Sequence, residues 1–421
     1  MPSRLISQSP RYQIRAIIII ALLMIIMMVS CKPQPGSQTS TSSTSTQQTP
    51  LEPNPESGSS ATGEPTSISE PPQATPPITE VPTKTTSAPS PKGSPEIESE
   101  STPFVPILGG ADKIAFIEQN EIWMAGLDGS ALVQITDDGF EKSSLQWSPN
   151  GERLFFISEL CIHFINIDTI KPETLACFDQ SRRLDSFQIS PDGTQAAISL
   201  DGELYVVPFD EAKLRQARTG ADLTEMESCE SLAPYKHRQS MVLVNKTYWS
   251  TDGDRLAILR QAFDADEQVE LIQMLDVSRC IAPLPRLDEF PATRFEMENY
   301  ARSPIIQNFA WDGGDLFALT DFKRNDGYGD LWIYNTHLHT GFKANPVAGK
   351  CCYRDPVFSP DGKYLAFAFQ DASFAPDARA VLYYIPYAAL DSSLVFPPLS
   401  LPADFFAEQR SKPQPVLRGA P

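Results

Sequence analysis

A four-residue turn pattern recurs along most of the chain and constrains its fold more than any other feature. The pattern is Ser-Pro-Asp-Gly or a close variant, and an apolar run follows it directly. The turn and its run together occupy residues 147–157, 190–199, 249–259 and 358–369. Ser, Pro and Asp suit the first three positions of a type I turn, and the Gly takes the left-handed conformation that follows. Each copy therefore predicts a β-hairpin, with Asn150, Asp192, Asp252 and Asp361 as turn formers.

The spacing of these turns predicts a repeat architecture. With the degenerate copy at 311–314 included, the turn glycines are residues 151, 193, 253, 313 and 362. The spacings between them are 42, 60, 60 and 49 residues. Residues 109–112 are another degenerate copy of the turn. A period near 42 with insertions is typical of one four-stranded propeller blade per repeat. The second strands beginning at 113, 153, 195, 255, 316 and 364 predict an all-β, six-bladed β-propeller, and the two long repeats leave seven blades open.

Three stretches carry a resemblance to a known family. "WSPNGERLFF", "ISPDGTQAAI" and "FSPDGKYLAF" resemble the WD-like, Asp-Pro-type repeats of TolB-like β-propellers. The resemblance covers roughly residues 104–390 and implies the propeller fold, but propellers host many unrelated activities. Residues 391–421 are expected to form a Pro-rich C-terminal tail, whose apolar segments 394–402 and 405–406 close the ring or pack along it.

The N-terminus predicts export. Three arginines precede the apolar run 16–30, which is short for a membrane span and right for a signal peptide covering residues 1–30. Residues 28–31 resemble a bacterial lipobox, which implies that Cys31 receives lipid and anchors the protein to the membrane; several acyl chains on one cysteine hold firmly. The alternative is an uncleaved anchor, and both alternatives place the rest of the chain outside the cytoplasm, in the periplasm or at the cell surface.

A tether is predicted between this cysteine and the propeller. After Cys31, residues 32–103 contain 47 Ser, Thr, Pro or Gly among 72 residues and no aromatic residue. Such a composition buries too little apolar surface to offset backbone entropy, so 31–103 is expected to be a disordered linker. The net charge of −19 repels phosphate backbones, which excludes nucleic acid as a partner.

Six further cysteines fit an oxidising compartment. A hairpin centred on residue 169 would set Cys161 opposite Cys177, at a distance that suits a disulfide. Cys229 and Cys280 lie in the two expanded repeats and are candidates for a second bridge. The neighbours Cys351 and Cys352 are left open: they form a vicinal ring, pair with others or stay reduced.

No catalytic constellation is found. The sequence has no G-x-S-x-G elbow, P-loop, G-x-G-x-x-G after a strand or H-E-x-x-H, so we expect neither an enzyme nor a cofactor. The acidic segment 321–330 departs from a calcium loop because Lys323 occupies a ligand position, so no metal site is expected. His337 and His339 precede Thr-Gly and are expected in a solvated turn.

Function is expected on the disc face opposite the Ser-Pro-Asp-Gly turns, where the long loops gather. The binding-face candidates are Tyr328, Tyr353, Arg354, Asp326 and Asp330. The preferred hypothesis is a binding module for a protein or a glycan. The alternatives are a carbohydrate-active enzyme with a loop-built site and a structural component of the cell envelope.

Overall fold

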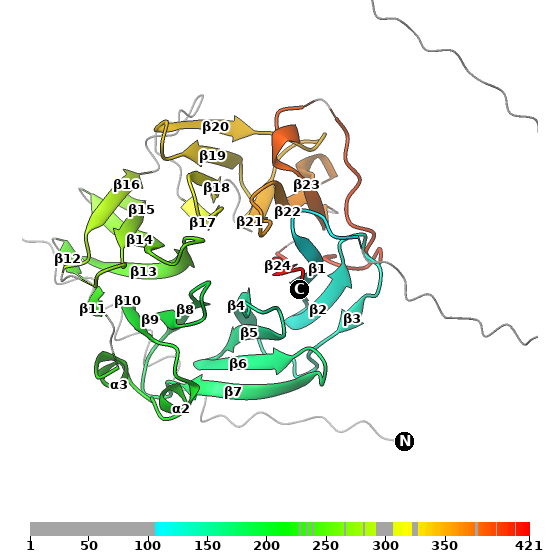
Figure 1. Cartoon of the computed structure of the whole chain (residues 1–421). Helices are drawn as coiled ribbons and strands as arrows, with labels where there is room; N and C mark the ends of the chain where they lie inside the picture. Colours follow the sequence, from blue (N-terminus) through cyan, green and yellow to red (C-terminus); the bar gives the residue numbers. More distant parts are fainter. Residues whose placement is uncertain are drawn as a thin grey trace, which may run out of the picture. The chain divides into compact units, whose positions relative to one another are not determined.

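The computed structural model shows six β-sheets arranged as blades around one axis (Figure 1). It describes residues 106–226, 229–232, 235–237, 240–264, 267–280, 283–291, 306–321, 327–374, 378–392, 394–408 and 410–421. The predicted signal peptide, Cys31 and the linker lie outside the described residues. The six-bladed β-propeller predicted from the turn spacing is confirmed, and the seven-bladed alternative is excluded.

Every blade is antiparallel, and the strands nearest the axis are β24, β4, β8, β13, β17 and β21. Blade 1 contains β24 (Val416–Gly419), β1 (Ala111–Glu118), β2 (Glu121–Gly126) and β3 (Val133–Gln134). Blade 2 contains β4 (Lys142–Trp147), β5 (Arg153–Ser158), β6 (Cys161–Asn166) and β7 (Lys171–Cys177). Blade 3 contains β8 (Leu184–Ile189), β9 (Gln195–Leu200), β10 (Glu203–Pro208) and β11 (Cys229–Leu232).

The other three blades vary more in strand number. Blade 4 contains the short β12 (Tyr235–His237), then β13 (Ser240–Trp249), β14 (Arg255–Asp264), β15 (Glu267–Asp276) and β16 (Arg286–Pro291). Blade 5 contains β17 (Ile306–Trp311), β18 (Leu316–Asp321), β19 (Leu331–Asn335) and β20 (Thr340–Ala344). Blade 6 contains β21 (Tyr353–Phe358), β22 (Tyr364–Gln370) and β23 (Ala380–Pro386).

Short helices lie outside the sheets. They are α2 (Glu211–Leu214), α3 (Gly220–Thr224), η2 (Ala372–Phe374) and η3 (Tyr387–Ala389). The Asp210 side chain caps α2 by accepting from the backbone N–H groups of Ala212 and Lys213, and Leu214 is buried in the blade 2–blade 3 core. α2 therefore covers the core at the outer side of these two blades.

The repeated turns join the first and second strands of blades 2 to 6 on one face, called here the turn face. In the last copy the Ser359 hydroxyl donates to Asp361 Oδ1 at 2.8 Å and accepts from the Tyr364 backbone N–H at 2.9 Å. The same pair of bonds occurs at Ser148 and Ser190. The prediction that Asp361 and its counterparts are turn formers is confirmed.

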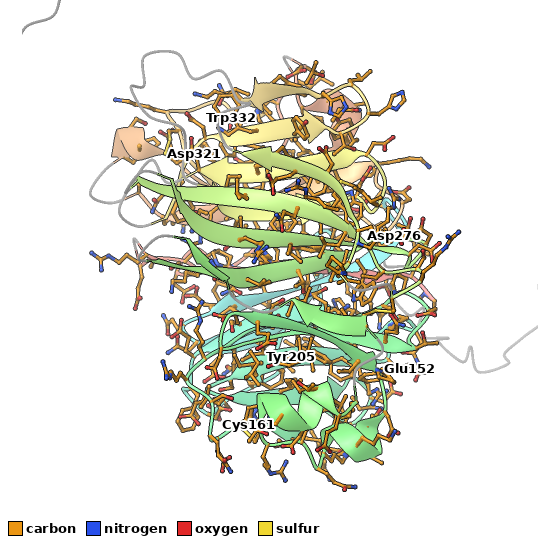
Figure 2. The ribbon with its side chains drawn as sticks, turned by 90° about the vertical axis from the view of Figure 1, so that its left-hand side faces the viewer. Glu152, Cys161, Tyr205, Asp276, Asp321 and Trp332 are labelled. Atoms are coloured by element: carbon orange, nitrogen blue, oxygen red, sulfur yellow. A yellow bond between two sulfur atoms is a disulfide. The ribbon has the colours of Figure 1, made fainter. Side chains whose placement is uncertain are left out.

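The opposite face, called the loop face, carries the turns between second and third strands and the connections between blades. Seen edge-on, the disc places Glu152 and Asp276 toward one face and Cys161 and Asp321 toward the other (Figure 2). This alternation follows from antiparallel order, because each strand that begins on one face ends on the other.

Blade 1 is closed by the two ends of the propeller. Residues Ala115, Ile114 and Lys113 of β1 pair with Val416, Leu417 and Arg418 of β24. The Arg418 guanidinium also forms an ion pair with Asp112. The boundary expected at residue 390 is therefore wrong, since the ring includes Gly419, and the closing segment is β24 rather than 394–402 or 405–406. These residues pack along blades 1 and 6 instead, and Leu399 donates its N–H to Leu382 O at 2.8 Å.

Candidate binding site in the central channel

The inner strands of blades 2 to 6 each carry a bulge at the same place. Their registers shift by one residue between Ser143 and Gln146, Leu184 and Ser186, Val244 and Lys246, Ile306 and Asn308, and Arg354 and Val357. A bulge interrupts the ladder and re-aims a side chain. In each of the five blades the bulge includes the position four residues before the first residue of the following turn or lies directly beside it, so the five bulges meet around the axis at one level.

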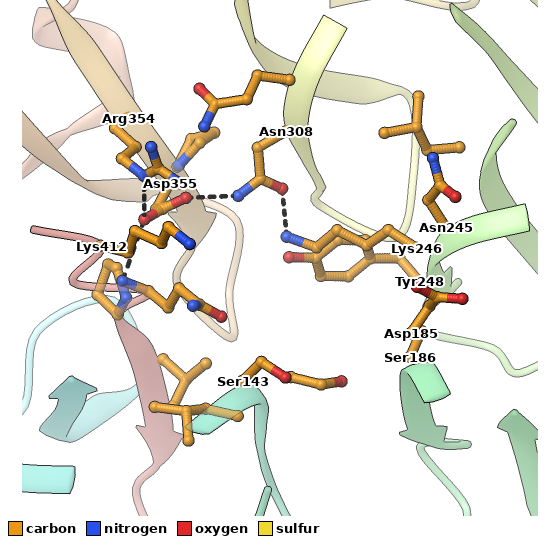
Figure 3. A pocket seen from close by; sticks show the side chains of 18 of the residues that line it. Ser143, Asp185, Ser186, Asn245, Lys246, Tyr248, Asn308, Arg354, Asp355 and Lys412 are labelled. Atoms are coloured by element: carbon orange, nitrogen blue, oxygen red, sulfur yellow. Dashed lines mark hydrogen bonds and ion pairs between the residues drawn. The ribbon is translucent and has the colours of Figure 1, made fainter. Parts of the chain in front are cut away.

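A pocket of about 400 Å³ lies at this level (Figure 3). It is lined mostly by polar side chains, and the aromatic Tyr248 contributes from blade 4. The amides are Gln188, Asn245, Gln307, Asn308 and Gln414, and the hydroxyls are Ser143, Ser144 and Ser186. The volume falls at the low end of the range for small-ligand sites, roughly 300–1,000 Å³.

Side chains from three neighbouring blades form one network on the wall of this pocket. Lys246 Nζ of blade 4 donates to Asn308 Oδ1 of blade 5. Asn308 Nδ2 donates to Asp355 Oδ1 of blade 6 at 2.7 Å. Asp355 Oδ2 accepts from Arg354 Nε at 3.0 Å and from the Gln414 backbone N–H at 3.2 Å. The dashed lines of Figure 3 follow this chain of contacts.

The charge of Asp355 is held by its partners. Burial alone would raise the pKa of this carboxyl, but the charges of Arg354 and Lys246, with the hydrogen bonds from Asn308 and Gln414, lower it below its ordinary value. Asp355 is therefore ionised at neutral pH. Lys246 also lies 5.1 Å from the centroid of the Tyr248 ring, a distance that suits a cation–π contact.

Two other ion pairs border the pocket. The Arg183 guanidinium donates to both oxygens of Asp185 at 2.6 Å, and its Nη2 donates to Asn245 Oδ1 at 3.1 Å. Burial nevertheless raises the pKa of the Asp185 carboxyl. Lys412 Nζ and Glu141 Oε1 lie 3.5 Å apart, and both side chains are largely exposed. Each acidic side chain of the pocket wall thus has a basic partner.

Side-chain bonds between adjacent inner strands make the wall rigid. Gln146 exchanges two bonds with the backbone of Ile189, its Oε1 accepting at 2.7 Å and its Nε2 donating at 2.9 Å. Ser144 Oγ accepts from the Phe187 N–H at 3.1 Å. Ser186 Oγ lies 2.9 Å from Thr247 Oγ1 in the next blade. The pocket is preformed, because its lining strands are tied to one another by these contacts.

The structure brings four of the five binding-face candidates together between blades 5 and 6, but it buries them. The exposed fractions are 0% for Tyr328, 1% for Tyr353, 4% for Asp330 and 7% for Arg354. The Arg354 Cζ lies 5.8 Å from the Tyr328 ring centroid, and Tyr328 OH donates to Ser411 O at 3.2 Å. Asp326 lies outside the described residues.

These four candidates therefore differ in position. Arg354 lines the channel pocket, whereas Tyr328 and Tyr353 are packed beneath the surface. Tyr353 OH donates to Asn345 Oδ1 at 2.8 Å and supports the connection to β21. Burial raises the pKa of this phenol. Asp330 reaches a second pocket, described next.

The second pocket, of about 500 Å³, lies beside Cys351 and Cys352, which are joined by a disulfide. Its other lining residues are Asp330, Lys343, Asn345, Gly349, Lys350 and Ala372. Asp330 Oδ2 accepts from Lys343 Nζ at 2.8 Å. Backbone bonds fix the loop: Lys350 N–H donates to Asp371 Oδ1 at 3.0 Å and Ala372 N–H to Lys350 O at 2.8 Å. The pocket thus combines a sulfur and alkyl surface with charged and amide groups.

The other cysteines also form bridges. Cys161 lies directly opposite Cys177 in the β6–β7 ladder, and their sulfur atoms are bonded. Cys229 and Cys280 form a disulfide that joins blade 3 to the connection after β15.

Neither a metal centre nor a membrane-spanning helix is found in the described parts of the chain. Groups of three or more His, Cys, Asp or Glu with metal-binding geometry do not occur there. None of the helices described is both long and apolar enough to cross a bilayer. His163 stacks on Phe156 with ring centroids 5.3 Å apart, and burial lowers its pKa. His337 and His339 are exposed at the β19–β20 turn.

Apart from Arg354, sequence reasoning missed the channel residues, although they have a regular signature. Two residues, usually polar, stand five and four positions before the first residue of each turn: Ser143 and Ser144, Asp185 and Ser186, Asn245 and Lys246, Gln307 and Asn308, and Arg354 and Asp355. A polar pair at this constant spacing, inside strands that are otherwise apolar, could have indicated a polar channel.

The sequence matches no protein-family model and no curated protein. Among solved structures, TolB from Acinetobacter baumannii is 14% identical with a TM-score of 0.45, over 73% of this chain and 66% of that protein, less than two thirds of its length. A putative TolB from Agrobacterium tumefaciens is 15% identical with a TM-score of 0.39, over 66% of this chain and 88% of the other. Hydrazine synthase of Kuenenia stuttgartiensis is 14% identical with a TM-score of 0.36, over 58% and 62%.

Proposed function

We propose that this protein is an exported, lipid-anchored binding module that engages a protein partner through the loop-face end of its central channel. One observation carries the proposal: five inner strands place bulges at one level and build a preformed polar pocket there. Preformed concave sites with convergent polar groups are the usual places of ligand recognition. Rigid walls also reduce the entropy lost when a partner binds.

Binding is favoured over acid–base catalysis by the state of Asp355 and Asp185, the two carboxylates of the pocket wall that are paired with arginine. Asp355 is kept ionised by its cationic partners, and Asp185 has both oxygens in hydrogen bonds to Arg183. A glycosidase needs one carboxyl group that is free to give up a proton to the substrate. With both groups bound to arginine, the carbohydrate-active alternative has weak support.

Photo-crosslinking tests the partner site. A benzophenone amino acid placed at Lys412, at the rim of the pocket, is expected to capture a protein in living cells. The matched control places the same group at Lys363 on the turn face, where 77% of the side chain is exposed. Capture from Lys363 with none from Lys412 would contradict the proposal.

The proposed location, outside the cytoplasm and anchored to the membrane, rests on the N-terminal sequence and on the cysteines. Residues 28–31 resemble a lipobox, and three disulfides are typical of an oxidising compartment. We expect Cys31→Ala to abolish incorporation of labelled palmitate and to release the protein from the membrane fraction. Labelling that persists in this variant would remove the lipoprotein assignment.

A glycan is the second candidate ligand, because of the pocket beside Cys351 and Cys352. Its sulfur and alkyl surface suits the apolar face of a sugar ring, while Asp330, Asn345 and the lysines suit the hydroxyl groups. Glycan-array binding that is lost in Asn345→Ala and kept in the channel variant Ser143→Ala would support this candidate. Array binding unaffected by Asn345→Ala would exclude this pocket.

A further inference from the structure

We propose that the channel pocket receives the carboxyl terminus of an extended peptide, with the carboxylate bound by Lys246. The inference deepens the proposed function and rests on it. Its starting point is the balance of charge in the pocket, where every other charged side chain of the wall already has an oppositely charged partner.

Three ion pairs account for the other charges. Arg183 pairs with Asp185, Arg354 with Asp355, and Lys412 with Glu141. No carboxylate forms an ion pair with Lys246 in the described part of the chain; its partners are Asn308 Oδ1 and the Tyr248 ring. Lys246 and Arg354 both act on the single charge of Asp355. The Lys246 ammonium thus lacks a carboxylate of its own among the described residues, and an incoming anion would supply one.

Lys246 also has hydrogen-bonding capacity to spare. An ammonium group has three donors, and the structure uses one of them on Asn308. The three bonds shown for Asp355 come from Asn308, Arg354 and Gln414, and the one bond shown for Lys246 Nζ goes to Asn308. Two donors thus remain for the two oxygens of a carboxylate, in a part-buried site where charge-assisted hydrogen bonds are strong.

The lining around Lys246 favours a peptide over a bare ion. Asn and Gln side chains offer a donor and an acceptor side by side, which complement the C=O and N–H groups of an extended backbone. The pocket is lined by Gln188 of blade 3, Asn245 of blade 4, Gln307 of blade 5 and Gln414. The volume of about 400 Å³ admits the end of a chain rather than a folded surface. Capture of a chain terminus by such polar groups is a recurring mode of recognition.

Calorimetry on the full-length protein in detergent micelles, at low ionic strength, tests the inference. The probes are N-acetyl-triglycine, its C-terminal amide and inorganic phosphate. We expect the free acid to bind at least tenfold more tightly than the amide. Lys246→Met should abolish this difference, and Lys246→Arg should keep part of it. Lys363→Met, a change of the same kind on the turn face, should leave it intact.

Several results would overturn the inference: no binding of the acid, equal affinity for acid and amide, a difference that survives Lys246→Met, or phosphate binding as tightly as the acid. If Lys246→Met does not fold, the test uses the wild type and Lys246→Arg instead. The ratio of the affinities for the free acid and for the amide, measured in both proteins, then decides for or against the inference. Capture of a partner at Lys412 with no acid-to-amide difference would reject this inference and leave the proposed function standing. Loss of both results would reject both.

Discussion

Asn308 bridges Lys246 and Asp355, so that one amide joins side chains from blades 4, 5 and 6. Its oxygen accepts from Lys246 Nζ, and its nitrogen donates to Asp355 Oδ1 at 2.7 Å. Asp355 in turn binds Arg354 and the backbone of Gln414, which leads into β24 of blade 1. The ionised carboxylate is thus the point at which four blades meet.

Replacement of this carboxylate should be costly at neutral pH. Asp355→Asn removes the negative charge that acts on both the Arg354 guanidinium and the Lys246 ammonium, and breaking a buried ion pair costs about 3–5 kcal/mol of unfolding free energy. Because the folded pKa of Asp355 is lowered, its contribution is fully present above the unfolded value of about 3.9 and disappears as the pH falls through the folded value.

Urea denaturation at pH 7 and at lower pH measures this effect. We expect the difference between the wild type and Asp355→Asn to be largest at pH 7 and to shrink below pH 4. The control is Asp391→Asn, at an exposed turn, which should change stability little at pH 7. A difference between wild type and Asp355→Asn that stays constant with pH would mean that the charge is not the cause.

Gln146 is predicted to stabilise the contact between blades 2 and 3. In Gln146→Leu both backbone groups of Ile189 lose their partner, and each unpaired buried group costs about 1–3 kcal/mol. Gln146→Glu keeps the acceptor for Ile189 N–H and loses the donor to Ile189 O. Its destabilisation should decrease at acid pH, where the protonated carboxyl donates again. Equal urea midpoints for Gln146→Leu and the wild type would contradict this assignment.

The two long-range disulfides should differ in their effect on stability. In the chain-entropy account, a bridge across 16 residues contributes about 3 kcal/mol and one across 51 residues about 4 kcal/mol. Removal of Cys229 and Cys280, both replaced by Ala, is therefore expected to cost about 1 kcal/mol more than the same change at Cys161 and Cys177. Urea unfolding without reductant measures both; the reverse order would show that loop length is not the dominant factor.

Ring closure should depend on Leu417. This side chain lies in the blade 1 core, and a Leu→Ala change in a core costs about 2–5 kcal/mol. Val395→Ala removes apolar atoms from a residue that is 85% exposed and should be nearly neutral. Limited proteolysis should show faster cleavage of Leu417→Ala near residue 415. Equal cleavage rates of the two variants would argue against β24 as the closing element.

The hairpins could be predicted from the sequence because their turn chemistry is local. Ser359, Pro360, Asp361 and Gly362 specify their own conformation within four residues. β24 could not be found in the same way, because Val416–Gly419 has only four residues and no turn signature, and its partner Ala111–Glu118 lies about 300 residues earlier. Such a pairing depends on the ring as a whole.

The candidate site was predicted only in part, for a different reason. Tyr and Arg on a long connection suggest an exposed binding surface, but Tyr328 and Arg354 pack on each other between blades. Sequence gives the type of a residue, whereas burial depends on which blades meet. The polar pairs before each turn are a better signal of the site, because the same position in each repeat lies at the same level of the central channel.

The order of synthesis gives the closing strand a further role. β24 is made after every other strand of the ring, whereas its partner β1 is made first. The first blade therefore keeps an open edge at β1 until the end of the chain arrives, and unpaired strand edges can join other chains. The disc is complete only after β24 has been made, and the interval before closure is when a chaperone has most to protect.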